Sequence, residues 1–66
     1  MIEPLETRRI EMSNGSRQAV ATVGRYENGW TLLRIEEDGY PDVKDSDSLF
    51  NTFEEMELAA RTIWIR

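Results

Sequence analysis

Few side chains in this 66-residue sequence could carry out catalysis. It contains no histidine, the usual general base near neutral pH, and no cysteine, so nucleophilic catalysis lacks two of its commonest groups. A serine–lysine pair is conceivable only through Lys44 near Ser46 and Ser48, in a segment with the composition of a loop. We therefore expect no enzymatic activity, and no small-molecule substrate is evident.

Acidic side chains are the next group with possible chemistry. Residues 36–57 hold nine acids against one lysine, a net charge of −8 in a chain whose total is −5. A calcium loop of the EF-hand type needs acids at its first, third and fifth positions and glycine at its sixth. A loop that starts at Asp45 has Asp47 at its third position but Leu49 and Phe50 at its fifth and sixth. We expect no metal and no cofactor.

The acidic segment predicts a charged surface instead. Its expected members are Asp38, Asp42, Asp45, Asp47 and Glu54. Direct nucleic-acid binding is disfavoured, because proteins that bind a phosphate backbone usually carry a basic surplus.

Two Asn-Gly pairs predict the elements that hold these residues. Asn14-Gly15 and Asn28-Gly29 lie between runs rich in β-branched and apolar residues, which is a strong hairpin signal. The runs predict three strands over 5–13, 16–26 and 30–37. After a loop over 38–48, Thr52 is a good helix N-cap with Glu55 three residues later.

The helix that follows has one apolar stripe, made of Phe53, Met56, Ala59, Ala60, Ile63 and Trp64. The expected fold class is therefore α+β: a three-stranded antiparallel β-meander with one C-terminal helix packed on one face (β-β-β-α), in a single domain over 1–66.

The register of the second hairpin decides which residues are buried, because a one-residue change moves a strand's pattern to the other face. A two-residue Asn28-Gly29 loop pairs Glu27 with Trp30 and places Tyr26 with Leu33 and Ile35. A three-residue loop over 27–29, with Gly29 as a bulge, pairs Tyr26 with Trp30. We favour the three-residue loop, because it groups Ala19, Ala21 and Val23 with Leu33 and Ile35.

With this register, and a two-residue Asn14-Gly15 loop in the first hairpin, the sequence predicts a core and an uncovered sheet face. The predicted core is Ile10, Met12, Ala19, Ala21, Val23, Leu33, Ile35, Phe53, Met56, Ala60 and Ile63. The other face would carry Val20, Thr22, Tyr26, Trp30, Leu32 and Arg34.

The uncovered face is the expected partner-binding site, made of Tyr26, Trp30, Leu32, Arg34 and Val20, since aromatic residues and arginine are enriched in interface hot spots. In the alternative interpretation, the loop over 38–50 folds back and covers this face with Tyr40, Val43, Leu49 or Phe50.

The leading functional hypothesis is a small acidic protein-interaction domain (a regulator, inhibitor or assembly subunit) that binds a protein partner or itself as a homodimer. The first alternative is an acidic decoy that inhibits a nucleic-acid-binding protein, as phage or plasmid anti-defence proteins do. The second is a weak single-stranded nucleic-acid binder that stacks bases on Tyr26 and Trp30, with Arg25 and Arg34 beside them.

The N-terminal "MIEPLETRR" has no apolar signal region and no apolar run is long enough for a membrane span, so a cytoplasmic location is expected. The stretch "LFNTFEEMELAAR" is similar to the helix-opening pattern of small bacterial and phage β-β-α domains, and this similarity carries no functional residues over.

Overall fold

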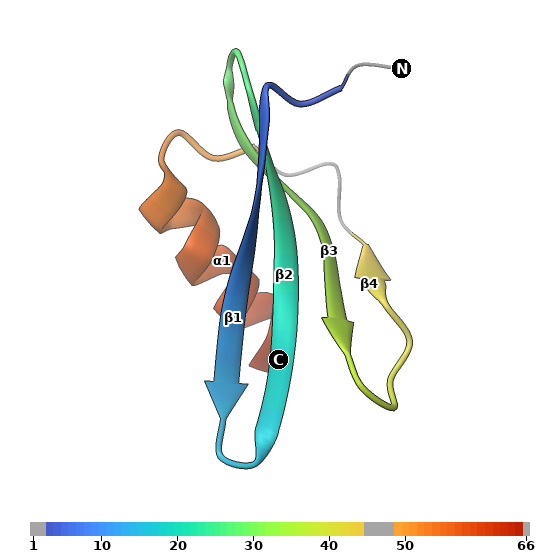
Figure 1. Cartoon of the computed structure of the whole chain (residues 1–66). Helices are drawn as coiled ribbons and strands as arrows, with labels where there is room; N and C mark the ends of the chain where they lie inside the picture. The colour runs from blue at the N-terminus through green and yellow to red at the C-terminus, as the bar shows by residue number, and fades with distance from the viewer. Residues whose placement is uncertain (1–2, 45–48, 66) are drawn as a thin grey trace.

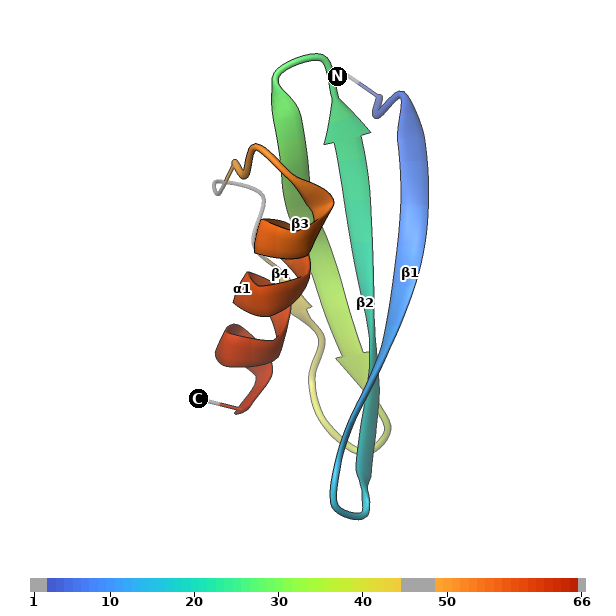
Figure 2. The same ribbon diagram turned by 90° about the vertical axis from the view of Figure 1, so that its left-hand side faces the viewer.

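Four strands form one antiparallel sheet, and a single helix lies against one of its faces (Figures 1 and 2). The computed structural model describes residues 3–44 and 49–65. The elements are β1 (Glu6–Asn14), β2 (Arg17–Tyr26), β3 (Gly29–Glu37), β4 (Val43–Lys44) and α1 (Phe53–Ile65). The strands lie in sequence order, β1-β2-β3-β4. The predicted α+β fold class is confirmed, and the short β4 is an addition that the sequence did not predict.

The helix begins where the sequence predicts. The Glu55 backbone N–H donates a hydrogen bond to the Thr52 hydroxyl oxygen at 3.2 Å, so Thr52 is the N-cap. The buried helix residues are Met56, Ala60 and Trp64, which follow one another at intervals of four and therefore lie on one face. Within the described residues, no helix is both long and apolar enough to cross a membrane.

The first hairpin has the predicted faces but a different turn. Asn14 pairs with Arg17, so the two loop residues are Gly15 and Ser16 rather than Asn14 and Gly15. Gly15 has a φ of 66°, which a glycine adopts without strain. Ile10 and Met12 pair with Ala21 and Ala19, on the helix side of the sheet, as expected.

At its turn, the second hairpin follows neither predicted register, whereas beyond the bulge Ala21 pairs with Ile35 as the predicted three-residue loop requires. Tyr26 pairs with Gly29 and Arg25 pairs with Trp30, so the loop is Glu27-Asn28. Gly29 is required for two reasons. Its φ is 142°, and a Cβ at this position would lie 2.4 Å from the Phe50 carbonyl oxygen. That close approach lets Trp30 and Phe50 exchange two backbone hydrogen bonds, of 2.7 and 2.8 Å.

A bulge in β3 then reverses the predicted sorting of its side chains. Val23 pairs with Leu32, but the next residue of β2, Thr22, pairs with Arg34. Leu33 is therefore the extra residue. Because of this insertion, Leu32 and Ile35 both face the helix, although residues three apart in a regular strand face opposite ways.

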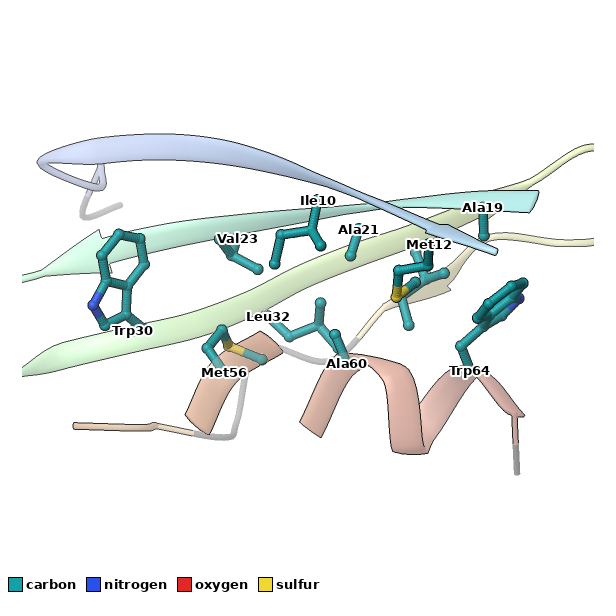
Figure 3. Close-up of a cluster of buried hydrophobic side chains, with 11 residues drawn as sticks. Ile10, Met12, Ala19, Ala21, Val23, Trp30, Leu32, Met56, Ala60 and Trp64 are labelled. Atoms are coloured by element: carbon teal, nitrogen blue, oxygen red, sulfur yellow. The ribbon is translucent and has the colours of Figure 1, made fainter. Parts of the chain in front are cut away.

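The core lies between α1 and the helix side of the sheet (Figure 3). Trp30 lies near Met56 at the start of the helix, and Trp64 lies near Ala19 at its end. The buried apolar residues are Ile10, Met12, Ala19, Ala21, Val23, Trp30, Leu32, Ile35, Met56, Ala60 and Trp64. Phe53 and Ile63, predicted as core, are partly buried and pack against this cluster.

Three predicted positions in β3 are wrong. Trp30 (8% exposed) and Leu32 (fully buried) belong to the core and not to the uncovered face. Leu33, predicted as core, is half-buried on the other face. The physical cause is the same in all three cases, since the turn and the bulge together shift the register of β3 against β2.

Candidate protein-binding surface

The sheet face away from α1 carries a band of apolar and polar side chains from β2 and β3. We define the open face as Val20, Thr22, Tyr26, Leu33 and Arg34. The first four are half-buried and Arg34 is exposed. Their positions follow from alternation in β2, where Ala19, Ala21 and Val23 are buried on the helix side and the residues between them face the opposite way.

A glycine organises one end of the open face. Gly24 lies between the side chains of Pro4, Leu33 and Tyr26, and a Cβ at this position would be 3.1 to 3.3 Å from each of them. All three are half-buried. The absence of a side chain at Gly24 therefore lets three apolar groups pack on the outer surface of the sheet, beside the second hairpin.

The described part of the loop over 38–50 does not fold back over this face. Val43 and Lys44 pair with Ile35 and Arg34, so they extend the sheet sideways as β4. Phe50 pairs with Trp30 at the edge of β3. The expectation that Tyr40, Val43, Leu49 or Phe50 covers the face is wrong for these residues, and Tyr40 is itself 61% exposed.

A hollow adjoins the open face at the end of the sheet where the β1–β2 turn lies. Its walls come from β1, β2, the end of β3 and the turn that follows β3. Five acids contribute to the lining, together with one arginine, Arg9; the acids are Glu11, Glu36, Glu37, Asp38 and Asp42. The apolar band of the open face thus continues into a predominantly acidic hollow, and Val20 belongs to both.

The predicted acidic surface is present where it is described. Asp38, Asp42 and Glu54 are exposed. Asp45 and Asp47 lie outside the described residues. Among the residues that are described, no three acidic side chains gather in an arrangement that could hold a metal ion.

The predicted site residues divide into two groups. Val20, Tyr26 and Arg34 lie together on the open face, as expected. Trp30 and Leu32 do not, because they pack under the helix. The Trp30 ring meets the Phe53 ring edge-on at 5.2 Å, and the Arg8 guanidinium carbon lies 5.2 Å from the Trp30 ring centre. This Trp30 environment excludes base stacking on its face.

Leu33 and Pro4 are open-face residues that sequence reasoning missed. The signal for Leu33 is the spacing of Trp30, Leu32 and Ile35. Three large apolar residues at intervals of two and three can share one face only if the strand contains an extra residue. Pro4 has no comparable signal, because its place depends on the space above Gly24.

A second polar cluster, on the helix side, fixes the end of α1. The Arg17 guanidinium donates to both Glu37 carboxylate oxygens at 2.7 and 2.8 Å, and the Trp64 indole N–H donates to the same carboxylate at 2.9 Å. These hydrogen bonds, first from Arg17 and then from Trp64, lower the pKa of Glu37 from 4.5 to about 2. The cluster is consistent with a structural role, since the Glu37 carboxylate ties β2, through Arg17, to the helix, through Trp64.

The chemistry of the open face is that of a contact surface: adjoining apolar groups, one arginine and an acidic rim. Among the described residues, the Arg34 side chain pairs with its neighbour Glu36, at 3.0 Å, and it is 46% exposed. Comparison with protein-family models, with curated proteins and with solved structures finds no match for this chain.

Proposed function

We propose that this protein is a small, non-enzymatic interaction domain that binds a protein partner through its open face. One observation carries the proposal. A sheet with a full hydrophobic core on one side also gathers apolar side chains, Val20, Tyr26 and Leu33, on the side without a helix. Apolar groups on a sheet face that no helix covers are typical of binding sites.

The chemistry of the surface specifies the partner in part. Apolar side chains from the partner would pack against Tyr26 and Leu33, while the acidic hollow beyond Val20 favours a basic group. Tyr26 and Arg34 belong to the residue types that most often dominate interface energetics. The partner surface would therefore combine an apolar patch with lysine or arginine.

The test compares two doubly substituted chains of equal charge. Val20→Glu with Leu33→Glu alters the open face. Leu58→Glu with Ile65→Glu alters the two exposed apolar residues of the helix, which are 67% and 56% exposed. Each tagged variant and the unmodified chain serve as bait for proteins of the source cells, and captured proteins are identified by mass spectrometry.

The unmodified chain and the helix variant should capture the same partner, and the open-face variant should lose it while keeping its circular dichroism spectrum. Equal capture by both variants would reject the open face as the binding surface. An unmodified, folded chain that captures no protein would reject the proposed function itself.

A second candidate function is an acidic decoy that occupies the basic groove of a nucleic-acid-binding protein. The acidic lining of the hollow supports it, with Asp38 and Asp42 on its exposed rim. Such a complex should weaken steeply as salt rises, and Asp38→Asn with Asp42→Asn should weaken it further. A captured partner that is indifferent to both changes would leave the apolar open face as the only candidate.

A further inference from the structure

The two edges of the sheet are unequal. At one edge, β4 has two residues, and Phe50 pairs with Trp30 further along β3. At the other edge, β1 presents nine residues, and no described element lies beyond it (Figure 2). A long free edge is a template for pairing with another strand.

The hairpin geometry identifies which backbone groups of β1 are free. A two-residue loop is closed by a hydrogen-bonded pair, here Asn14 and Arg17, and hydrogen-bonded pairs alternate along an antiparallel ladder. Met12 and Ile10 therefore bond to β2. The residues between them point their N–H and C=O groups out of the sheet; they are Thr7, Arg9, Glu11 and Ser13.

The helix leaves room at this edge. It packs chiefly against β3 and touches β1 much less. In Figure 2, β1 forms one rim of the sheet and α1 lies away from that rim. The side chains of Thr7, Arg9, Glu11 and Ser13 are exposed. A strand could therefore approach the edge without displacing any described element.

The charges on β1 complement a second copy of β1 in one register. In a two-fold antiparallel pair, facing residues lie on the same side of the sheet. From one allowed register to the next, the residue that faces a given position therefore changes by two. When Ile10 faces Ile10 of the second copy, Arg9 faces Glu11 twice, and all nine residues overlap. The adjacent registers instead place Arg9 against Arg9 or Glu11 against Glu11, which is unfavourable.

We propose that the protein forms a homodimer by antiparallel pairing of β1 with β1 of a second copy, centred on Ile10. The four outward-pointing residues of each copy would form about eight new backbone hydrogen bonds. The two four-stranded sheets become one continuous sheet, with both helices on one face and the two open faces side by side on the other. Arg9 and Glu11 also line the acidic hollow, but the backbone edge of β1 is separate from the open face, so the dimer does not rest on the proposed function.

Reversal of single charges tests the register directly. Arg9→Glu places glutamate against Glu11, and Glu11→Arg places arginine against Arg9, so each variant alone should dissociate. Because two like-charge pairs replace two ion pairs, the dimer dissociation constant should rise at least about tenfold. Both residues are exposed, so both variants should keep the fold, which circular dichroism checks.

The decisive arm mixes the two single variants. In the mixed pair, glutamate at 9 faces arginine at 11, and Glu11 faces Arg9, so an equimolar mixture should form a heterodimer. The double variant Arg9→Glu with Glu11→Arg should likewise dimerise with itself. Arg34→Glu, on the open face, is the control and should remain dimeric.

Sedimentation velocity over about 10 to 300 µM, a range suited to a small interface, measures all five samples and the unmodified chain. The expected result is a dimer for the unmodified chain, monomers for each single β1 variant, and a dimer for the mixture and the double variant. An unmodified chain that stays monomeric at the highest concentration would overturn the proposal. So would a dimer that ignores the charge reversals, or a mixture of single variants that stays monomeric.

Discussion

The two faces of this sheet are built from alternating residues of the same strands, yet they differ in what they can do. Under the helix, Leu32 and Ile35 are fully or almost fully buried, and Arg17 and Trp64 both donate hydrogen bonds to the Glu37 carboxylate there. On the open face, Leu33 and Tyr26 are only half-buried, and Arg34 is exposed. The first face forms the hydrophobic core, and the second leaves part of its apolar and charged side chains accessible to solvent.

The difference depends on one inserted residue. Without the bulge at Leu33, Leu32 and Ile35 would face opposite sides of the sheet. With it, Trp30 and Leu32 enter the core and Leu33 moves out beside Gly24. A local irregularity in one strand therefore decides which residues are available to a partner.

Leu32 and Leu33 test the difference between the two faces most strongly, because they are adjacent leucines on opposite faces. Leu32→Ala should lower the free energy of unfolding by about 3–5 kcal/mol, since it opens a cavity in a packed core. Leu33→Ala should cost about 1 kcal/mol, since its side chain is half-solvated. Urea denaturation of both variants provides the measurement. Equal losses, or a larger loss at Leu33, would mean that β3 has no bulge.

Gly29 tests the turn that sets the register on both faces. Gly29→Ala should lower the free energy of unfolding by about 2–3 kcal/mol, because it adds backbone strain at φ 142° and a collision with the Phe50 carbonyl. Gly15→Ala is the matched control. Its φ is also positive, but a Cβ there meets nothing within 4 Å, so about 1 kcal/mol is expected. Thermal unfolding should show Gly29→Ala as the less stable; the reverse order would exclude the Phe50 contact.

The pH dependence of stability tests the contribution of Glu37 on the helix side. The pKa of Glu37 is lowered to about 2 in the folded protein, so the carboxylate stabilises the fold fully above its ordinary pKa of 4.5. That contribution is lost as the pH falls from 4.5 towards 2. Stability measured across this window should decline less in Glu37→Gln than in the unmodified chain.

Trp64→Phe removes the second donor to the Glu37 carboxylate and should give an intermediate pH dependence. Identical curves for all three proteins would show that the cluster of Arg17, Glu37 and Trp64 does not form in solution.

Much of the fold could be predicted from the sequence, because its signals are local. The Thr52 cap needs only a hydroxyl before an amphipathic stretch, and the alternation in β2 places Ala19, Ala21 and Val23 on one face. The first hairpin kept its predicted faces despite a displaced turn. The shift changes the partner of each residue by two positions, and residues two apart in a strand lie on the same face.

The wrong positions all depend on contacts between distant residues. Asn28-Gly29 suggested a loop that contains Gly29, but Gly29 instead belongs to β3, pairs with Tyr26 and makes room for Phe50, which is 21 residues away in the sequence. The two residues of β4 carry no periodic pattern, and their pairing with Ile35 and Arg34 depends on the course of the loop. The candidate site changed accordingly, with Leu33 and Pro4 taking the places predicted for Trp30 and Leu32.

Accessibility of Trp30 tests most directly whether the two faces are sorted in this way. Trp30 is the larger of the two side chains that the sequence pattern assigns to the open face and the structure places in the core. In Trp64→Phe, Trp30 is the only tryptophan left. Acrylamide quenching of its fluorescence should be weak in the folded protein and should rise sharply in urea. Quenching that is already as strong in the folded protein as in urea would place Trp30 outside the core. That result would contradict the proposed composition of the open face.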